Sequence, residues 1–221
     1  MTEKIKKLIA ERKARVGIVG LGYVGLPLAV EFGKSGFAVT GFEVDAQKVR
    51  EIKQGNSYIP DVETATVAAL VKKGLLCATL DFSGLKKMDA VIICVPTPLR
   101  KSKDPDVSYI VASVQETRKY LKRGQLIVLE STTYPGTTKE LVKPMLEKGG
   151  LKAGRDFYLA FSPERVDPGN PKYGVKNTPK VVGGLTPVCT ELAGLLYGAA
   201  IDTVLKVSNT ETAELVKLAT P

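Results

Sequence analysis

The sequence contains no histidine and only three cysteines among its 221 residues. Catalysis by an imidazole base is therefore excluded, and a zinc site built on thiolates alone would need four of them. Cys77, Cys94 and Cys189 are widely separated and lie in apolar segments. We therefore expect buried, reduced thiols in a cytoplasmic protein.

Long apolar runs are also absent. No stretch is long enough to span a bilayer. The first residues, MTEKIKKLIAERKAR, show no apolar core followed by a small-residue cleavage site, so we expect neither a signal peptide nor a membrane partner. Hydrophobic residues make up 44% and charged residues 25%, which is typical of a globular protein.

The formal net charge is +9, which raises the question of a nucleic-acid partner. The basic residues are spread along the chain, and no aromatic residues are interleaved with them as a stacking platform. We therefore expect no nucleic-acid partner. A basic surface that attracts anionic nucleotides fits the composition equally well.

The most informative motif is a glycine-rich turn after the first apolar strand. Gly20-x-Gly22-x-x-Gly25 leads directly into a helix-like segment, and a second apolar run, 38–42, ends on Glu43. The first glycine allows a tight turn, the second lets a pyrophosphate approach the backbone, and the third lets the helix lie close to the strand. Strand, turn, helix, strand and carboxylate in this order predict dinucleotide binding.

The same motif bears on the choice of cofactor. The helix N-terminus offers free N–H groups and partial positive charge to a pyrophosphate. Glu43 would accept hydrogen bonds from the adenosine ribose and repel a 2′-phosphate, which favours NAD over NADP. Lys48, one helical turn after the predicted N-cap Asp45, slightly weakens the argument against NADP.

Strand and helix signals alternate along the chain, so we predict an α/β fold with a Rossmann-like, doubly wound, mainly parallel sheet, followed by the start of a central helix. The predicted domains are an N-terminal helix in 1–14, an NAD-binding domain in 15–207 and the linker helix from 208 to 221. The predicted strands are 15–20, 38–43, 77–80, 90–95, 126–129, 157–161, 180–182 and 203–207. The predicted helices are 3–13, 23–34, 46–53, 62–73, 107–122, 137–148, 186–197 and one beginning near 209.

Ligands of such sheets bind beyond the carboxyl ends of the strands. The loops at those ends carry hydroxyls, carboxylates and prolines. They are the turn 20–25, Glu43, and the segments 96–98, 130–133 and 162–170.

Five segments in order resemble motifs of the UDP-sugar 6-dehydrogenases of the UDP-glucose/GDP-mannose dehydrogenase superfamily. They are GIVGLGYVGLPLAVEFGKSG, VPTPL, ESTTYPGTT, SPERVDPGN and TETAELVK. The resemblance covers residues 15 to about 218. It is nearest to the UDP-N-acetylglucosamine and UDP-N-acetylmannosamine 6-dehydrogenases, with UDP-glucose 6-dehydrogenase a near relative. A 3-hydroxy-acid dehydrogenase of related fold is a weaker alternative, because SPERVDPGN argues against it.

The resemblance implies oxidation of the C6 hydroxymethyl group of a UDP-sugar to a carboxylate by two NAD in succession. A cysteine captures the aldehyde, and the resulting thioester is hydrolysed. The implied catalytic residues are Thr132 and Glu164, which work with water, and Lys217, which stabilises oxyanion charge. No metal is implied. The predicted cofactor-binding residues are Gly20, Gly22, Tyr23, Val24, Gly25, Glu43, Lys48, Val95, Thr97 and Thr132.

Each catalytic candidate also has a purely structural interpretation. In this interpretation, Glu164 is a loop carboxylate that pairs with Arg165. Thr132 is then a hydroxyl that satisfies backbone groups before a helix, and Lys217 is a solvated lysine on a helix face.

The chain departs from the family pattern near its end. No cysteine lies in the family's Gly-x-Cys-x-Pro setting, and Pro221 replaces the family's asparagine. Leu215, Val216 and Leu218 begin an apolar helix face, and we expect nothing left in the chain to bury it. We therefore expect the NAD-binding part of a longer enzyme, which binds NAD weakly to moderately and does not complete the oxidation alone. The alternative is a stand-alone, non-catalytic dinucleotide-binding module.

The same departure limits what is expected of partners. The family pairs subunits largely through the central helix, so we expect a homodimer for a full-length form and a monomer or weak dimer for this chain.

Overall fold

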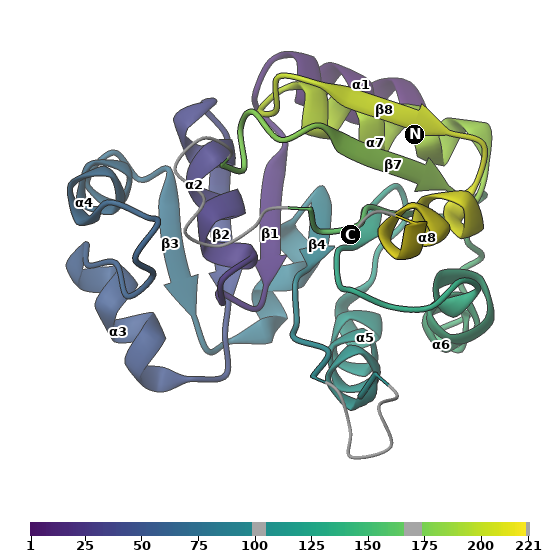
Figure 1. Ribbon diagram of the computed structural model, residues 1–221, viewed down its shortest axis with the longest axis horizontal. Helices are drawn as coiled ribbons and strands as arrows, with labels where there is room; N and C mark the ends of the chain where they lie inside the picture. The colour runs from purple at the N-terminus through teal and green to yellow at the C-terminus, as the bar shows by residue number, and fades with distance from the viewer. Residues whose placement is uncertain (99–104, 166–173, 220–221) are drawn as a thin grey trace.

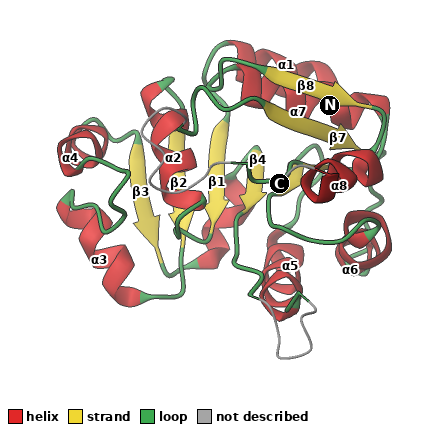
Figure 2. Ribbon diagram, in the orientation of Figure 1, coloured by secondary structure: helices red, strands yellow, loops and turns green. Residues whose placement is uncertain are grey.

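A single eight-stranded sheet organises the structure, a computed structural model that describes residues 1–98, 105–165 and 174–219. The strand order is β3-β2-β1-β4-β5-β6-β7-β8, with helices on both faces (Figures 1 and 2). The strands are β1 (Arg15–Val19), β2 (Ala38–Phe42), β3 (Leu76–Thr79), β4 (Ala90–Ile93), β5 (Leu126–Leu129), β6 (Tyr158–Phe161), β7 (Lys180–Gly184) and β8 (Val204–Val207). This confirms the predicted mainly parallel, doubly wound sheet.

The last two strands run against the other six. The six strands from β3 to β6 in the sheet order are parallel to one another, whereas β7 pairs antiparallel with β6 and parallel with β8. A parallel return needs a crossover, usually a helix, and the described parts of the β6–β7 connection contain none. Sequence alternation alone did not reveal this reversal.

The helices are α1 (Thr2–Ala10), α2 (Gly25–Lys34), α3 (Ala46–Gln54), α4 (Thr64–Lys72), α5 (Ser108–Tyr120), α6 (Lys143–Glu147), α7 (Pro187–Gly198) and α8 (Thr210–Ala219). A 3₁₀ helix, η1 (Phe82–Lys87), and a π-helical segment, η2 (Thr137–Val142), complete the elements. Helices α1, α2, α3, α4 and α7 pack into the core on one face of the sheet. Elements η1, α5, η2, α6 and α8 pack into the core on the other face.

The central strands are buried on both faces, and this explains their unbroken apolar sequences. In β4, Ala90 and Ile92 belong to one core, while Val91 and Ile93 belong to the other. Residues alternate between faces along a strand, so both sets must be apolar when helices cover both sides.

Most predicted elements lie within a few residues of those observed. Asp45 caps α3 as predicted, because its carboxylate accepts the backbone N–H groups of Gln47 and Lys48. Two expectations need correction. Cys77 is exposed, because its strand β3 is at the sheet edge, and the helix predicted over 137–148 begins with π-helical η2.

Helix α8 packs against β7, β6 and η2. Leu215 is 52% exposed, while Val216 packs against the second core, so the predicted apolar face is only partly uncovered. The side chains of residues 217–219 lie outside the described part.

Among the described helices, none combines the length and apolar character that crossing a membrane requires.

Candidate functional site

The first residues beyond five neighbouring strands form a row along the carboxyl edge of the sheet. The final residues of these strands, Phe42, Val19, Ile93, Leu129 and Phe161, are register partners of their neighbours. The residues that follow them are Glu43, Gly20, Cys94, Glu130 and Ser162. This row joins the predicted cofactor turn to the loops that carry the predicted catalytic residues.

The three glycines of the turn meet three different requirements. Gly20 has φ +89°, and a Cβ there would lie 2.8 Å from the carbonyl oxygen of Cys94. A Cβ on Gly25 would lie 1.8 Å from the carbonyl oxygen of Gly20, so α2 can only start this close to the strand with glycine. A Cβ on Gly22 would meet no atom within 4 Å, which leaves its backbone open to a ligand.

Glu43 connects the end of β2 to the glycine turn. One carboxylate oxygen accepts the N–H of Leu21 at 2.9 Å, and the other accepts the N–H groups of Val44 and Asp45 at 2.8 and 3.2 Å. A carboxylate oxygen accepts more than one hydrogen bond, so the oxygen facing Leu21 retains capacity for a ribose hydroxyl. Glu43 is buried, and the turn and the carboxylate therefore form one rigid unit.

Tyr58 holds the turn from the other side. Its hydroxyl donates to the carbonyl oxygen of Leu21 at 2.7 Å, and burial raises the pKa of this phenol, with the charge of Glu43 adding to the effect. Sequence reasoning missed Tyr58, because nothing in its spacing from the turn indicated contact.

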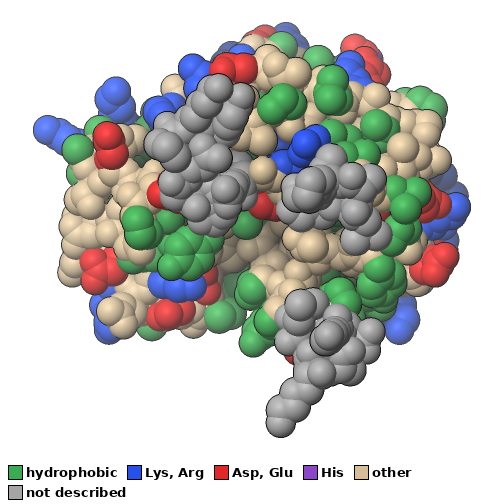
Figure 3. Space-filling model, in the orientation of Figure 1, with side chains coloured by type: hydrophobic (Ala, Val, Ile, Leu, Met, Phe, Trp, Pro, Cys, Tyr) green, Lys and Arg blue, Asp and Glu red, His purple; other side chains and the backbone are tan. Residues whose placement is uncertain are grey.

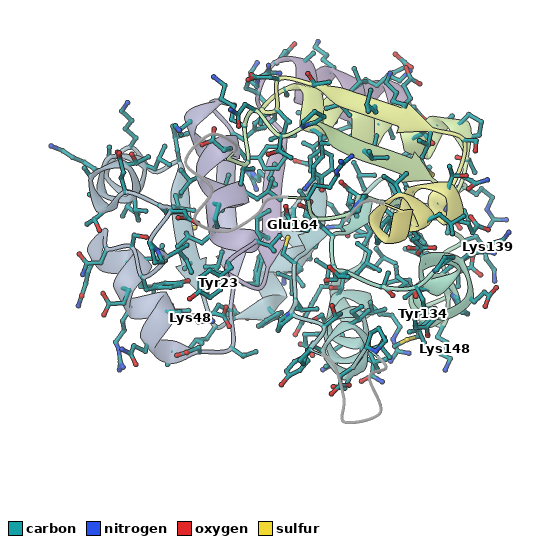
Figure 4. All side chains as sticks on the ribbon, viewed as in Figure 1. Tyr23, Lys48, Tyr134, Lys139, Lys148 and Glu164 are labelled. Carbon is teal, nitrogen blue, oxygen red and sulfur yellow. The ribbon has the colours of Figure 1, made fainter. Side chains whose placement is uncertain are left out.

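The other predicted cofactor residues surround this turn. Val24 is the N-cap of α2, which has no side-chain cap among the described residues, so its N-terminal dipole faces the turn. Tyr23 is 65% exposed, and the Lys48 amine lies 3.8 Å from the Glu43 carboxylate. Figure 4 shows Tyr23 and Lys48 on the α2–α3 side of the molecule.

Val95 and Thr97 follow β4 and are half-buried. Ser131, after β5, donates its hydroxyl to the carbonyl oxygen of Val95 at 2.7 Å and so joins the two loops. Its neighbour Thr132 is exposed. Figure 3 shows this face of the molecule hollowed between the side chains over α2 and α3 and those over α5.

The structure places Glu164 near the centre of the molecule, on the loop after β6 (Figure 4). Its carboxylate accepts the backbone N–H of Arg165 at 2.7 Å and lies 3.4 Å from the amine of Lys180. Lys217 lies in α8, but its side chain is outside the described part. Thr132 and Glu164 therefore lie on adjacent loops at one edge, and the position of the Lys217 amine stays a prediction.

A buried charge cluster lies behind Glu164. Lys180 is 3% exposed and forms an ion pair with Glu130, and the Tyr197 hydroxyl donates to the other oxygen of Glu130. Burial raises the pKa of Glu130 to about 7, and the charge of Glu164 adds to this, although Lys180 and Tyr197 oppose it. The negative partners raise the pKa of Lys180 despite its burial.

Sequence reasoning missed Lys180 and Tyr197 as site residues. The available signal was a lysine opening an apolar strand, where a solvated position is the usual interpretation. Ser162 was also missed. Its hydroxyl is buried and has no hydrogen-bond partner within the described part of the chain.

The described residues include no group of side chains that would hold a metal ion. They do fit a dinucleotide, because an open glycine backbone, an uncapped helix N-terminus and a carboxylate with spare acceptor capacity converge at one turn. The fold and this turn define a dinucleotide-binding α/β protein.

Comparison with known proteins identifies the family. Residues 14–201 match the NAD-binding domain of the UDP-glucose/GDP-mannose dehydrogenase family, so the chain belongs to this family and its cofactor is NAD. It is 39% identical over 206 residues to the UDP-N-acetyl-D-glucosamine 6-dehydrogenase of Pseudomonas aeruginosa, covering 92% of this chain and 48% of that protein. The UDP-N-acetyl-D-mannosamine dehydrogenase of Pyrococcus horikoshii is 34% identical, with 92% and 49% covered.

Solved structures agree. The NDP-N-acetyl-D-galactosaminuronic acid dehydrogenase from Methanosarcina mazei Go1 superposes with a TM-score of 0.87 at 35% identity, covering 98% of this chain and 49% of that one. A GDP-mannose dehydrogenase gives a TM-score of 0.85 at 31% identity. The chain thus spans about half the length of the curated relatives it matches. The predicted family, Rossmann-like fold and NAD cofactor are confirmed.

Proposed function

We propose that this chain is the NAD-binding part of an enzyme that oxidises the C6 hydroxymethyl group of a UDP-sugar, either a UDP-N-acetylhexosamine or UDP-glucose, to the uronic acid. The carrying observation is the turn in which Gly22 stands open beside the anchored carboxylate of Glu43. NAD bound there supplies the hydride acceptor. The names of the relatives support a nucleotide-sugar substrate.

The residues of this chain divide between binding and chemistry in this proposal. The α2 N-terminus binds the pyrophosphate, and Glu43 binds the adenosine ribose. Thr132 and Glu164 hold water at the opposite end of the cofactor, with Glu164 as the base. Lys217 stabilises negative charge on the sugar oxygen.

The cysteines of this chain do not suit the nucleophilic step. Burial raises the pKa of Cys94 well above its usual range, and Cys189 is buried too. Cys77 is exposed, but it lies on the edge strand β3. A thiolate is the reactive form, so we propose that this polypeptide alone does not complete the oxidation.

Calorimetric titration with NAD and NADP tests the binding proposal. We expect NAD to bind more tightly than NADP, because the Glu43 carboxylate repels a 2′-phosphate. Glu43→Gln should weaken NAD binding about tenfold, roughly the loss of one charge-assisted hydrogen bond, and reduce the preference for NAD. Glu116→Gln, on the surface of α5, is the matched control and should change neither. Equal affinities for the two cofactors in the parent chain would contradict the assignment.

Turnover is tested separately. The chain mixed with NAD and a UDP-sugar should produce no NADH. Production of NADH by this polypeptide alone would refute the proposal that it cannot complete the oxidation by itself.

A further inference from the structure

The Lys180 side chain is only 3% exposed, and its amine lies between two carboxylates from different loops. It forms an ion pair with Glu130, the first residue after β5, and lies 3.4 Å from a carboxylate oxygen of Glu164. The ring of Tyr197 is 5.7 Å from the amine, measured to the ring centroid. An ammonium group is costly to bury unless it is paired, so the buried position of Lys180 requires its carboxylate partners.

The reversal of β7 explains how a lysine reaches this place. In the antiparallel β6–β7 pair, Phe161 is opposite Gly183. Glu164 is three residues after Phe161, and Lys180 is three residues before Gly183. Because the two strands are antiparallel, both residues lie side by side beyond the carboxyl end of β6. A parallel β7 would instead present its first residue at the other edge of the sheet.

Lys180 is itself held in place by Glu130 and Tyr197. Glu130 is fully buried, one of its oxygens contacts Lys180 and the other accepts the hydroxyl of Tyr197 on α7. Cys94, at the end of β4, faces the same cluster as a neutral thiol, since burial raises its pKa. The ammonium therefore has a fixed location set by β5, β7 and α7, whereas Glu164 belongs to a loop.

We propose that Lys180 is a positioning residue, which holds the loop carboxylate of Glu164 at the carboxyl edge of the sheet through their buried ion pair. This inference rests on the proposed function, in which Glu164 is the base. It assigns to β7 and α7 a role in the chemistry without placing either in contact with substrate. Lys180 acts through Glu164, and Glu130 and Tyr197 keep the amine in place.

Carboxyl ¹³C NMR of the glutamate-labelled chain tests the proposal, with the Glu164 signal identified by its loss in Glu164→Gln. In Lys180→Met, the titration midpoint of Glu164 should rise by about one pH unit or more, because an opposite charge within about 4–6 Å favours the ionised form. Lys180→Arg should restore most of the parent midpoint. Lys139→Met, which removes an amine exposed on η2, should leave it unchanged.

The reciprocal measurement does not require a variant in the core. At neutral pH, removing the charge of Glu164 in Glu164→Gln should change the ¹⁵N chemical shift of the labelled Lys180 amine, because the amine loses a charged partner 3.4 Å away. If Lys180→Met does not fold, this measurement decides alone. The proposal is overturned if the Glu164 midpoint is the same in Lys180→Met and in the parent, or if the ¹⁵N shift of the Lys180 amine is unchanged in Glu164→Gln.

NAD titration of the same samples separates this inference from the proposed function. If the carboxylate and amine are coupled but NAD does not bind, the proposed function fails while the ion pair stands. If NAD binds and the coupling is absent, the positioning role fails alone.

Discussion

The two ends of the carboxyl edge of the sheet use different chemical groups, backbone at one end and charged side chains at the other. Around β1 and β2 the site is made of backbone, with an open Gly22, an uncapped helix N-terminus and a Glu43 carboxylate held by N–H groups. Around β5 to β7 it is made of buried side-chain charge, with Lys180 between two carboxylates. The first arrangement suits a ligand that is held by its phosphates, and the second suits groups that hold or move a proton.

The difference also decides how each end tolerates change. A backbone site fails when atoms are added, because no side chain is available to rearrange. A charge cluster fails when one member is removed, because the remaining charges stay buried without a partner. Substitutions can therefore separate the two ends.

The largest effect is expected at Gly25. Gly25→Ala places a Cβ 1.8 Å from the carbonyl oxygen of Gly20, and neither backbone segment can yield easily. We expect the free energy of unfolding, measured in urea, to fall by about 3 kcal/mol or more. Gly22→Ala is the matched control, because its Cβ meets nothing within 4 Å, and it should preserve stability while weakening NAD binding. Equal destabilisation by both variants would contradict the view that Gly25 is needed for packing and Gly22 for ligand access.

The charged end of the edge should make the free energy of unfolding depend on pH. The carboxyl of Glu130 has an ordinary pKa of 4.5, and burial raises its pKa to about 7 in the folded chain. Between these values the folded state binds more protons than the unfolded state, so this group lowers the free energy of unfolding as pH rises through that window. The lowering approaches about 3 kcal/mol by pH 7.

Urea unfolding of the parent chain and Glu130→Gln across this window isolates the effect. The stability of the parent relative to the variant should decline between pH 4.5 and about 7. A difference between the two that is independent of pH would contradict the titration of Glu130 in this range.

The backbone end could be predicted from the sequence because its parts are close in the chain. The spacing of Gly20, Gly22 and Gly25 encodes a turn by itself, and Glu43 follows on the adjacent strand. The apolar run of β4 likewise indicates a strand covered on both faces.

The charged end could not be predicted in the same way. Glu130, Glu164, Lys180 and Tyr197 come from different elements of the fold, and Lys180 lies beside Glu164 because β7 runs antiparallel to β6. No local pattern encodes that reversal. The exposure of Cys77 was missed for a similar reason, because a short strand does not reveal whether it lies at the sheet edge.

Another long-range contact lies at the start of the helix after Gly136. The carboxylate of Glu214 on α8 accepts the N–H groups of Gly136 and Thr138 at 2.6 and 2.8 Å and the Thr138 hydroxyl at 2.7 Å. Helix N-termini carry unpaired N–H groups, and here a distant helix supplies their acceptor. The same contact ties α8, which contains Lys217, to the loop that carries Thr132.

Two carboxylates of α8 contact the start of η2, Glu214 through buried hydrogen bonds and Glu211 through an exposed ion pair. Comparing them gives the smallest effect and the most direct test of what burial contributes. Glu214→Ala leaves buried donors without an acceptor and should lower the free energy of unfolding by about 2 kcal/mol. Lys139→Met breaks the exposed pair with Glu211, whose atoms are 2.8 Å apart, and should change it by less than about 0.5 kcal/mol. Urea unfolding of both variants at one pH measures the contrast. Similar losses in the two variants would mean that the buried acceptor contributes no more than the exposed ion pair to the attachment of α8.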